Sequence, residues 1–486
     1  MSTGKAMCWM LAAVIGISTA VWAAEAAPGG EGRGRRGGGA APAGPPRARS
    51  VVQVQLPPPA FPTQLLPDSP FGINTAFGPG TADLIRRLEG FQQVGIKWGR
   101  QGFSWRAIER ENGVYDFSAY DEFVDTCHKY GLSLFGQLSG PPPFHNYRTP
   151  EGVAAYARFA AACARHYRGK VDHWQILNEP NNAGQFKEHP EQYAALLAAA
   201  GKAIHEANPD AKVLGMNTAF IDTIWIEKIL SMVPYDCFDI LCVHPYRSMS
   251  APEDKLDWWQ KDQYVGAYYR DTLDENWPMI RQSFLEQVAE LDKVMAKFGA
   301  LKPVWVTEIC WNTNIHPYGT PEIRQADMLV RFHVLAMASQ RVQKVFWWTY
   351  RDSGSRQYDM ADMVGIVRNN YEPKYAYFAY AFMTRMLEGK KWVRNERLGP
   401  DIFLVVFDDE KANQEIMVAW ANRPYAYIRV GNTQAGLTFY DVYGTMRFVE
   451  FDPVRTASLP VPLGESPIYI VGPRGLKANV RPDPGW

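Results

Sequence analysis

The sequence has no surplus of charge of either sign and no long apolar segment. Its 486 residues carry 51 basic and 51 acidic side chains, which gives no electrostatic basis for binding nucleic acid or an anionic membrane surface. The longest apolar run, from Met7 to Trp22, is shorter than the roughly 20 apolar residues that a membrane-spanning helix requires. We therefore expect a neutral partner, no nucleic acid and no insertion into a membrane.

Cysteine and histidine are scarce, with six and nine residues. Cys8 lies in the N-terminal apolar run, and the remaining cysteines are odd in number and lack metal-type spacing. We expect no disulfide framework, although a bond between Cys237 and Cys242 stays open. The histidines form no HxH pair or cluster, so we expect no metal site and no cofactor.

Aromatic residues, in contrast, are abundant. They make up 13% of the chain, with 16 Trp and 24 Tyr. Packing in a core explains part of this number, and the apolar faces of sugars also stack well on aromatic rings. The composition therefore favours a carbohydrate as the neutral partner.

The N-terminal region predicts export. Lys5, the apolar run from Met7 to Trp22 and the small residues that follow are typical of a signal peptide over residues 1–26, so we expect a secreted or periplasmic protein. Residues 27–68 are rich in Gly, Pro and Arg and cannot bury a core, which predicts a disordered linker. Contact of its arginines with an acidic wall polymer is the less favoured alternative.

After Pro70, short β-rich runs alternate with amphipathic helical segments, as in a parallel α/β fold. Eight such pairs predict a (β/α)8 TIM barrel over residues 69–388, with an active site at the C-terminal ends of its strands. The predicted strands are 71–74, 96–100, 132–138, 171–177, 212–215, 240–243, 304–307 and 345–348. Residues 389–486 show only short alternating strands, which predict a small C-terminal all-β sandwich. We favour a structural appendage over a carbohydrate-binding module for it.

Two glutamates stand at the ends of predicted strands. Glu179 follows strand four beside Asn178, and Glu308 ends the apolar strand seven. Because barrel strands end at one mouth, both carboxylates should face the same cavity. Such a pair can cleave a glycosidic bond, since one carboxyl protonates the leaving oxygen while the other acts as nucleophile or base. Spacing in the sequence does not measure the gap between them, so retaining and inverting mechanisms both stay open at this point.

The motif Trp-x-x-x-Asn-Glu-Pro on strand four, with a lone glutamate ending strand seven, resembles glycoside hydrolase clan A. Segment 105–117 also looks like the clan's region after strand two. The terminal β domain is similar to that of family 39, which includes β-xylosidases and α-iduronidases. The resemblance implies a retaining mechanism, with Glu179 as acid/base and Glu308 as nucleophile.

The same resemblance implies roles for neighbouring residues. By analogy with clan members, we expect Asn178 to bind the sugar 2-hydroxyl, and Arg100 and Tyr246 to contact the nucleophile. We expect His244 to line the sugar subsite and Trp348 to form its floor. Trp311, just beyond strand seven, is also expected to bind substrate. A structural ion pair on the barrel rim stays open for Arg100. Strand three lacks the histidine that clan members often carry there, and His145 is the candidate substitute.

The stretch between Tyr246 and Ile280 is long for a barrel loop and is rich in aromatic residues. Long ordered loops at a barrel mouth commonly shape binding sites, so we expect an aromatic lid that narrows the cleft and favours exo action. The residues concerned are Trp258, Trp259, Tyr264, Tyr268, Tyr269 and Trp277.

Two other functions stay open. A metal-dependent barrel hydrolase would use Glu179, His244, Glu308 and His145, but the absence of clustered histidines disfavours it. A non-catalytic carbohydrate-binding barrel is disfavoured by the presence of both glutamates. The sequence identifies neither the sugar and its linkage nor the oligomeric state.

Overall fold

The computed structural model describes residues 66–480 apart from 76, 183, 248, 257–280, 316–318, 424–425, 432–436 and 448–457. The predicted signal peptide and nearly all of the predicted linker lie outside the described residues. In the part of the chain that is described, no helix combines the length and the apolar character needed to cross a membrane.

Eight parallel strands close into a barrel in sequential order, with β8 pairing back onto β1. They are β1 (Phe71–Asn74), β2 (Trp98–Ser104), β3 (Ser133–Ser139), β4 (His173–Ile176), β5 (Lys212–Ala219), β6 (Ile240–His244), β7 (Val304–Ile309) and β8 (Val342–Trp347). This confirms the predicted TIM barrel. The strand ends differ by a few residues, since β2 continues to Ser104 rather than Arg100 and β5 to Ala219 rather than Gly215.

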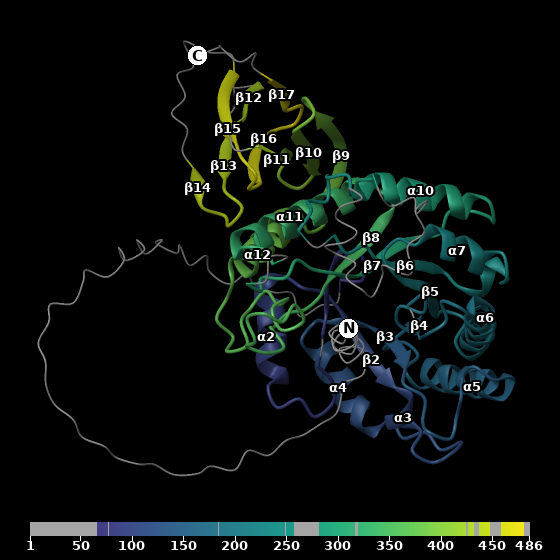
Figure 1. Cartoon of the computed structure of the whole chain (residues 1–486). Helices are drawn as coiled ribbons and strands as arrows, with labels where there is room; N and C mark the ends of the chain where they lie inside the picture. The colour runs from purple at the N-terminus through teal and green to yellow at the C-terminus, as the bar shows by residue number, and fades with distance from the viewer. Residues whose placement is uncertain are drawn as a thin grey trace, which may run out of the picture. The chain divides into compact units, whose positions relative to one another are not determined.

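A ring of helices covers the outside of the barrel (Figure 1). They are α2 (Leu84–Val94), α3 (Trp105–Ile108), α4 (Ser118–Lys129), α5 (Pro150–His166), α6 (Pro190–Ala207), α7 (Thr223–Leu230), the 3₁₀ helix η1 (Tyr235–Cys237), α10 (Phe284–Ala296), α11 (Glu322–Ala338) and α12 (Tyr375–Leu387). Local sequence signals set some of their starts. The Thr149 side chain accepts the Gly152 N–H at the start of α5, and Ser283 and Glu286 form a capping box at the start of α10.

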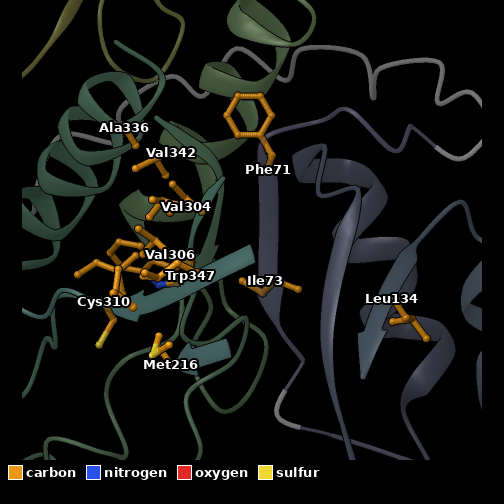
Figure 2. Packing of buried hydrophobic residues seen from close by; sticks show 14 of the residues in the cluster. Phe71, Ile73, Leu134, Met216, Val304, Val306, Cys310, Ala336, Val342 and Trp347 are labelled. Carbon is orange, nitrogen blue, oxygen red and sulfur yellow. The ribbon is translucent and has the colours of Figure 1, made fainter. Parts of the chain in front are cut away.

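Strand side chains alternate between two packed layers. Phe71, Val304 and Val306 belong to the large apolar cluster that strands and helices share (Figure 2). A second cluster contains alternate strand residues, namely Trp98, Phe135, Leu214, Ile240, Cys242, Trp305 and Phe346. Gly72 makes room for it, because a Cβ there would lie 2.4 Å from the Phe346 ring. These apolar side chains form a packed layer that is separate from the polar residues His244 and Glu308 near the carboxyl ends of β6 and β7.

Beyond α12 the chain forms antiparallel sheets. One has the order β14-β13-β16-β11-β10-β9 and the other β15-β12-β17. The strands are β9 (Lys391–Arg397), β10 (Ile402–Asp409), β11 (Gln414–Ala421), β12 (Ala426–Gly431), β13 (Thr438–Tyr440), β14 (Met446–Arg447), β15 (Ser458–Leu463), β16 (Ile468–Pro473) and β17 (Lys477–Val480). Leu404 and Ile470 of the first sheet share an apolar cluster with Ile428 of the second, as in sheets that pack face to face. This confirms the predicted β-sandwich.

The five cysteines in the described residues are all buried and unpaired. Cys237 and Cys242 therefore form no disulfide in this structure, which settles the pairing that the sequence left open. Burial raises the pKa of the Cys237 thiol to about 12, so this thiol is protonated and unreactive at neutral pH.

Candidate active site

Glu179 and Glu308 lie together at the carboxyl ends of the barrel strands. Glu308 belongs to β7 and Glu179 follows β4. With His244 at the end of β6, each offers a side-chain atom within 4.8 Å of the others. Both glutamates are largely buried, with 8% of Glu179 and 6% of Glu308 exposed. The fold thus brings together the two carboxylates that the sequence predicted at one mouth.

Glu308 reaches the mouth because β7 is irregular near its end. Val306 packs in the outer apolar cluster, and strict alternation would place Glu308, two residues later, on the same face. The pairing of β7 with β8 shifts register between Val306 and Ile309, and such an irregularity re-aims side chains. As a result Thr307, whose Oγ1 lies 3.0 Å from His244 Nε2, and Glu308 both contact residues of the site.

Three side chains hold the Glu308 carboxylate. Arg100 Nη1 donates a hydrogen bond to Oε1, the Tyr246 hydroxyl donates to Oε2 at 2.6 Å, and His244 Nδ1 lies 3.7 Å from Oε2. Burial raises the pKa of Glu308, but the charges of His244 and Arg100 and the hydrogen bonds from Tyr246 and Arg100 outweigh it and hold this pKa below its usual value. Glu308 is therefore ionised at neutral pH.

Glu179 shares His244 with Glu308 and has a strained backbone. Its Oε1 lies 2.8 Å from His244 Nδ1, and its Oε2 accepts a hydrogen bond from Asn182 Nδ2 at 2.7 Å. Its backbone N–H donates to the Asn217 carbonyl at 3.0 Å. Glu179 has a φ of 44° and Leu177 a φ of 59°, a conformation that costs a non-glycine residue about 1–2 kcal/mol and that clusters at functional sites.

Arg100 connects Glu308 to two polar residues of the segment that leads to Glu179. This buried arginine of β2 donates from Nε to Gln175 Oε1 at 2.8 Å and from Nη2 to Asn178 Oδ1 at 2.5 Å, in addition to its bond with Glu308. The planar guanidinium fixes the directions of these bonds. The ion pair of Arg100 at the barrel mouth is thus made with Glu308, the residue to which the resemblance gives the role of nucleophile.

Trp348 lies beside this group. Its ring is T-shaped against Tyr246, with the centroids 6.3 Å apart, and its side chain is half-buried. The preceding Trp347 is fully buried and donates its indole N–H to the Val364 carbonyl. Of these two tryptophans, Trp348 is the one that is available to a ligand.

Trp311 requires a correction. The sequence placed it among the substrate-binding residues, but its side chain is fully buried. It stacks on Trp347 with the ring centroids 6.1 Å apart and donates its indole N–H to the Ser250 carbonyl. Its surface is already covered by these contacts, so we assign Trp311 to packing beneath the site.

His145 does not join the glutamates. Its Nε2 lies 3.3 Å from Glu109 Oε1, and its ring stacks on Trp105 with the centroids 5.0 Å apart. Among the described residues, the group able to share a metal ion consists of Glu179, His244 and Glu308, without His145. The four-residue set of the metal-dependent alternative is therefore not assembled.

Sequence reasoning missed three polar residues of the site, namely Gln175, Asn182 and Thr307. Gln175 and Thr307 are fully buried and Asn182 nearly so. The sequence contains a signal for Gln175 and Thr307, since each is a polar residue within an otherwise apolar strand. A polar side chain buried there needs a hydrogen-bonding partner. Asn182 follows Glu179 by three residues, a spacing at which a side chain can bond back across a turn.

The predicted aromatic lid, with Trp258 and Trp259, falls within residues 257–280, outside the described residues. The exo action inferred from it stays a prediction.

Comparisons of sequence give short matches. No protein-family model matches the chain. A β-1,4-xylanase from Dictyoglomus thermophilum is 29% identical over 144 residues, which covers 26% of this chain and 40% of the xylanase. The chain spans less than half the length of the curated relatives that it matches.

Comparisons of structure cover most of the chain. A family 39 glycoside hydrolase from Bacteroides cellulosilyticus WH2 matches with a TM-score of 0.70 and 20% identity, over 83% of this chain and 80% of that one. A GH39 β-xylosidase from Caulobacter crescentus matches with a TM-score of 0.58 and 16% identity, over 84% and 96%. The chain shares the fold of family 39 glycoside hydrolases. The likeness covers more than four fifths of this chain in both cases, in agreement with the resemblance seen in the sequence.

Proposed function

We propose that the protein is a retaining glycoside hydrolase that acts by double displacement. The observation that carries this proposal is the pair of buried carboxylates, Glu179 and Glu308, which offer oxygen atoms within 4.8 Å of each other. Retaining enzymes hold their two carboxyl groups ~5–5.5 Å apart, whereas inverting enzymes leave ~6.5–9.5 Å for a water molecule. The short separation supports retention.

The unequal surroundings of the two groups support distinct roles. Glu308 is kept ionised by Arg100 and Tyr246, as a nucleophile requires. In the first step a Glu308 oxygen bonds to the anomeric carbon, the bond to the leaving group breaks, and Glu179 gives its proton to the leaving oxygen. In the second step a water molecule attacks the anomeric carbon, Glu179 takes a proton from that water, and the ester bond to Glu308 breaks.

His244 suits both protonation states of Glu179. Its Nδ1 lies 2.8 Å from Glu179 Oε1 and its Nε2 lies 3.0 Å from Thr307 Oγ1. A charged imidazolium donates through Nδ1 to the carboxylate form, and a ring whose Nδ1 carries no proton accepts from the carboxylic acid form. The histidine can thus hold Glu179 in place before and after the proton is transferred.

The substrate in this proposal is a carbohydrate. The names of the similar proteins include a β-1,4-xylanase and a β-xylosidase, so β-xylosides are the first compounds to assay. Exo action and export also belong to the proposal, and they rest on the aromatic residues of 257–280 and on the apolar run from Met7 to Trp22.

The proposal can be tested with a panel of aryl glycosides, first on the wild type and then on Glu308→Gly and Glu179→Gly with added azide. In Glu308→Gly, azide should occupy the place of the nucleophile and yield a glycosyl azide of inverted configuration. In Glu179→Gly, azide should attack the glycosyl-enzyme and yield the retained configuration. The two variants thus assign the two roles separately.

Glu111→Gly is the matched control, because Glu111 is an exposed carboxylate and its removal should leave turnover unchanged. A wild type that is folded but turns over no glycoside would refute the proposed function. Inverted product from the wild type would refute the retaining mechanism while leaving a glycosidase.

A further inference from the structure

A buried arginine, Arg331 of α11, joins three segments that are far apart in the sequence. Its side chain is 1% exposed and forms a two-pronged ion pair with Glu253, whose side chain is 2% exposed. The distances are 2.9 Å from Nε to Oε1 and 2.8 Å from Nη2 to Oε2. Its Nη2 also donates to Asn422 Oδ1, and its Nη1 donates to the Glu465 carbonyl at 3.4 Å.

Two of these acceptors belong to the C-terminal β-sandwich. Asn422 directly follows β11, and Glu465 lies between β15 and β16. The same face of α11 makes two more bonds to this domain, from Arg324 to the Glu465 carboxylate and from Ser466 to Asp327 Oδ2. Positions 324, 327 and 331 are spaced to share one side of a helix. The β-sandwich is therefore fastened to the helix that precedes β8.

The third acceptor, Glu253, belongs to the segment that follows β6 and that also contains Tyr246, Arg247 and Asp254; this segment is called the β6 loop below. Asp254, the next residue, accepts a hydrogen bond from Asn422 Nδ2 at 3.3 Å. The loop also closes on itself, because Arg247 donates to the carbonyl oxygens of Ala251 at 3.2 Å and Asp254 at 2.5 Å. Asp254 is thus bonded both to Asn422 of the β-sandwich and to Arg247, the neighbour of Tyr246.

We propose that Asn422 and Arg331 are positioning residues through which the β-sandwich holds the β6 loop, and with it Tyr246, against the nucleophile. The inference rests on the proposed function. Asn422 both accepts from Arg331 and donates to Asp254, so it ties the loop to the domain directly as well as through the Arg331–Glu253 pair. The β-sandwich acts on the reaction through this loop, without contacting the substrate.

The test compares Asn422→Ala with the wild type of the full chain, by hydrogen exchange and by the pH dependence of kcat/KM. Removing a hydrogen bond to a charged group should speed exchange in peptides covering residues 245–256 about tenfold. It should lower kcat/KM for an aryl glycoside about five- to tenfold. The acidic limb of the pH profile should move to higher pH, because the Tyr246 hydrogen bond helps to hold down the pKa of Glu308.

Two variants in the same domain serve as controls. Ile428→Val removes a methylene group from the β-sandwich core and lowers its stability without touching Asn422, and Tyr427→Ala changes an exposed side chain. Neither should change exchange at 245–256 or the pH profile.

Unchanged exchange in Asn422→Ala would overturn the proposal, and so would faster exchange with a wild-type pH profile. If the wild type hydrolyses no glycoside, the proposed function fails, and the exchange of residues 245–256 alone then decides whether the domain holds the loop.

Discussion

Removing one hydroxyl group beside Glu308 tests how the site holds its charge. Tyr246 donates to Glu308 Oε2 at 2.6 Å, and Glu308 is 6% exposed, so water does not readily replace the lost donor. A hydrogen bond to a charged group contributes about 1.5–3 kcal/mol. We therefore expect Tyr246→Phe to lower kcat/KM by roughly 10- to 150-fold, since about 1.4 kcal/mol corresponds to a factor of ten in rate.

The pH dependence gives the sharper result. The Tyr246 hydrogen bond is one of the interactions that hold the pKa of Glu308 below its usual value. Without it that pKa rises, so less of the nucleophile is ionised at a given acidic pH, and the acidic limb of kcat/KM moves upward. The assay measures the initial rate across the acidic and neutral pH range, with an aryl glycoside that has a good leaving group. Such a leaving group needs little protonation, so the rate depends less on the protonation state of Glu179.

Tyr235→Phe is the matched control. It also removes a tyrosine hydroxyl that donates a hydrogen bond, here to the Ala300 carbonyl at 2.8 Å, but Tyr235 lies in η1, ahead of β6 and away from the strand ends that carry the site. If Tyr246→Phe keeps the rate and the acidic limb of the wild type, as Tyr235→Phe should, the reasoning about Glu308 is refuted.

Two other outcomes follow from buried charges, and a third concerns metal ions. Burial raises the pKa of Asp327 to about 7, from 3.8 in the unfolded chain. The free energy of unfolding of the wild type therefore falls as the pH rises between these two values. Above pH 7, urea unfolding should show Asp327→Asn to be more stable than the wild type by up to about 4 kcal/mol. Equal stability of the two proteins at all pH values would contradict this. Arg331→Met leaves Glu253 buried without its cation and should lower the free energy of unfolding by about 3–5 kcal/mol, most of which the double change with Glu253→Met should restore. Activity should survive dialysis against EDTA, whereas a loss that a divalent metal reverses would favour the metal-dependent alternative.

The barrel and the two glutamates could be predicted because they follow from regular patterns. Alternation of β-rich and helical segments specifies parallel strands, and in a closed barrel all strands end at the same mouth. Glu179 and Glu308 were therefore both expected at that mouth. Arg100, His244 and Tyr246 were expected in the site through the resemblance to clan A, and the structure places Arg100 within β2, His244 at the end of β6 and Tyr246 two residues beyond it.

What the sequence could not supply depends on local departures from regularity. Strict alternation would have turned Glu308 away from the mouth, and the register shift between Val306 and Ile309 reverses this. Trp311 and Trp348 both follow strands near the site, yet one is covered by Trp347 and the other is accessible. The ties of Arg331 to the β-sandwich depend on how two domains pack, which no periodicity within one segment encodes.

The most direct test of the central claim is to trap the covalent intermediate. The 2-deoxy-2-fluoro analogue of the best aryl glycoside should form the glycosyl-enzyme but hydrolyse slowly, because the fluorine destabilises the charged transition states of both steps. Digestion and mass spectrometry of the inactivated protein should then locate one fluorosugar on Glu308, with no label in Glu308→Gly. A label on Glu179, or rapid turnover to an inverted product without any covalent adduct, would contradict the account.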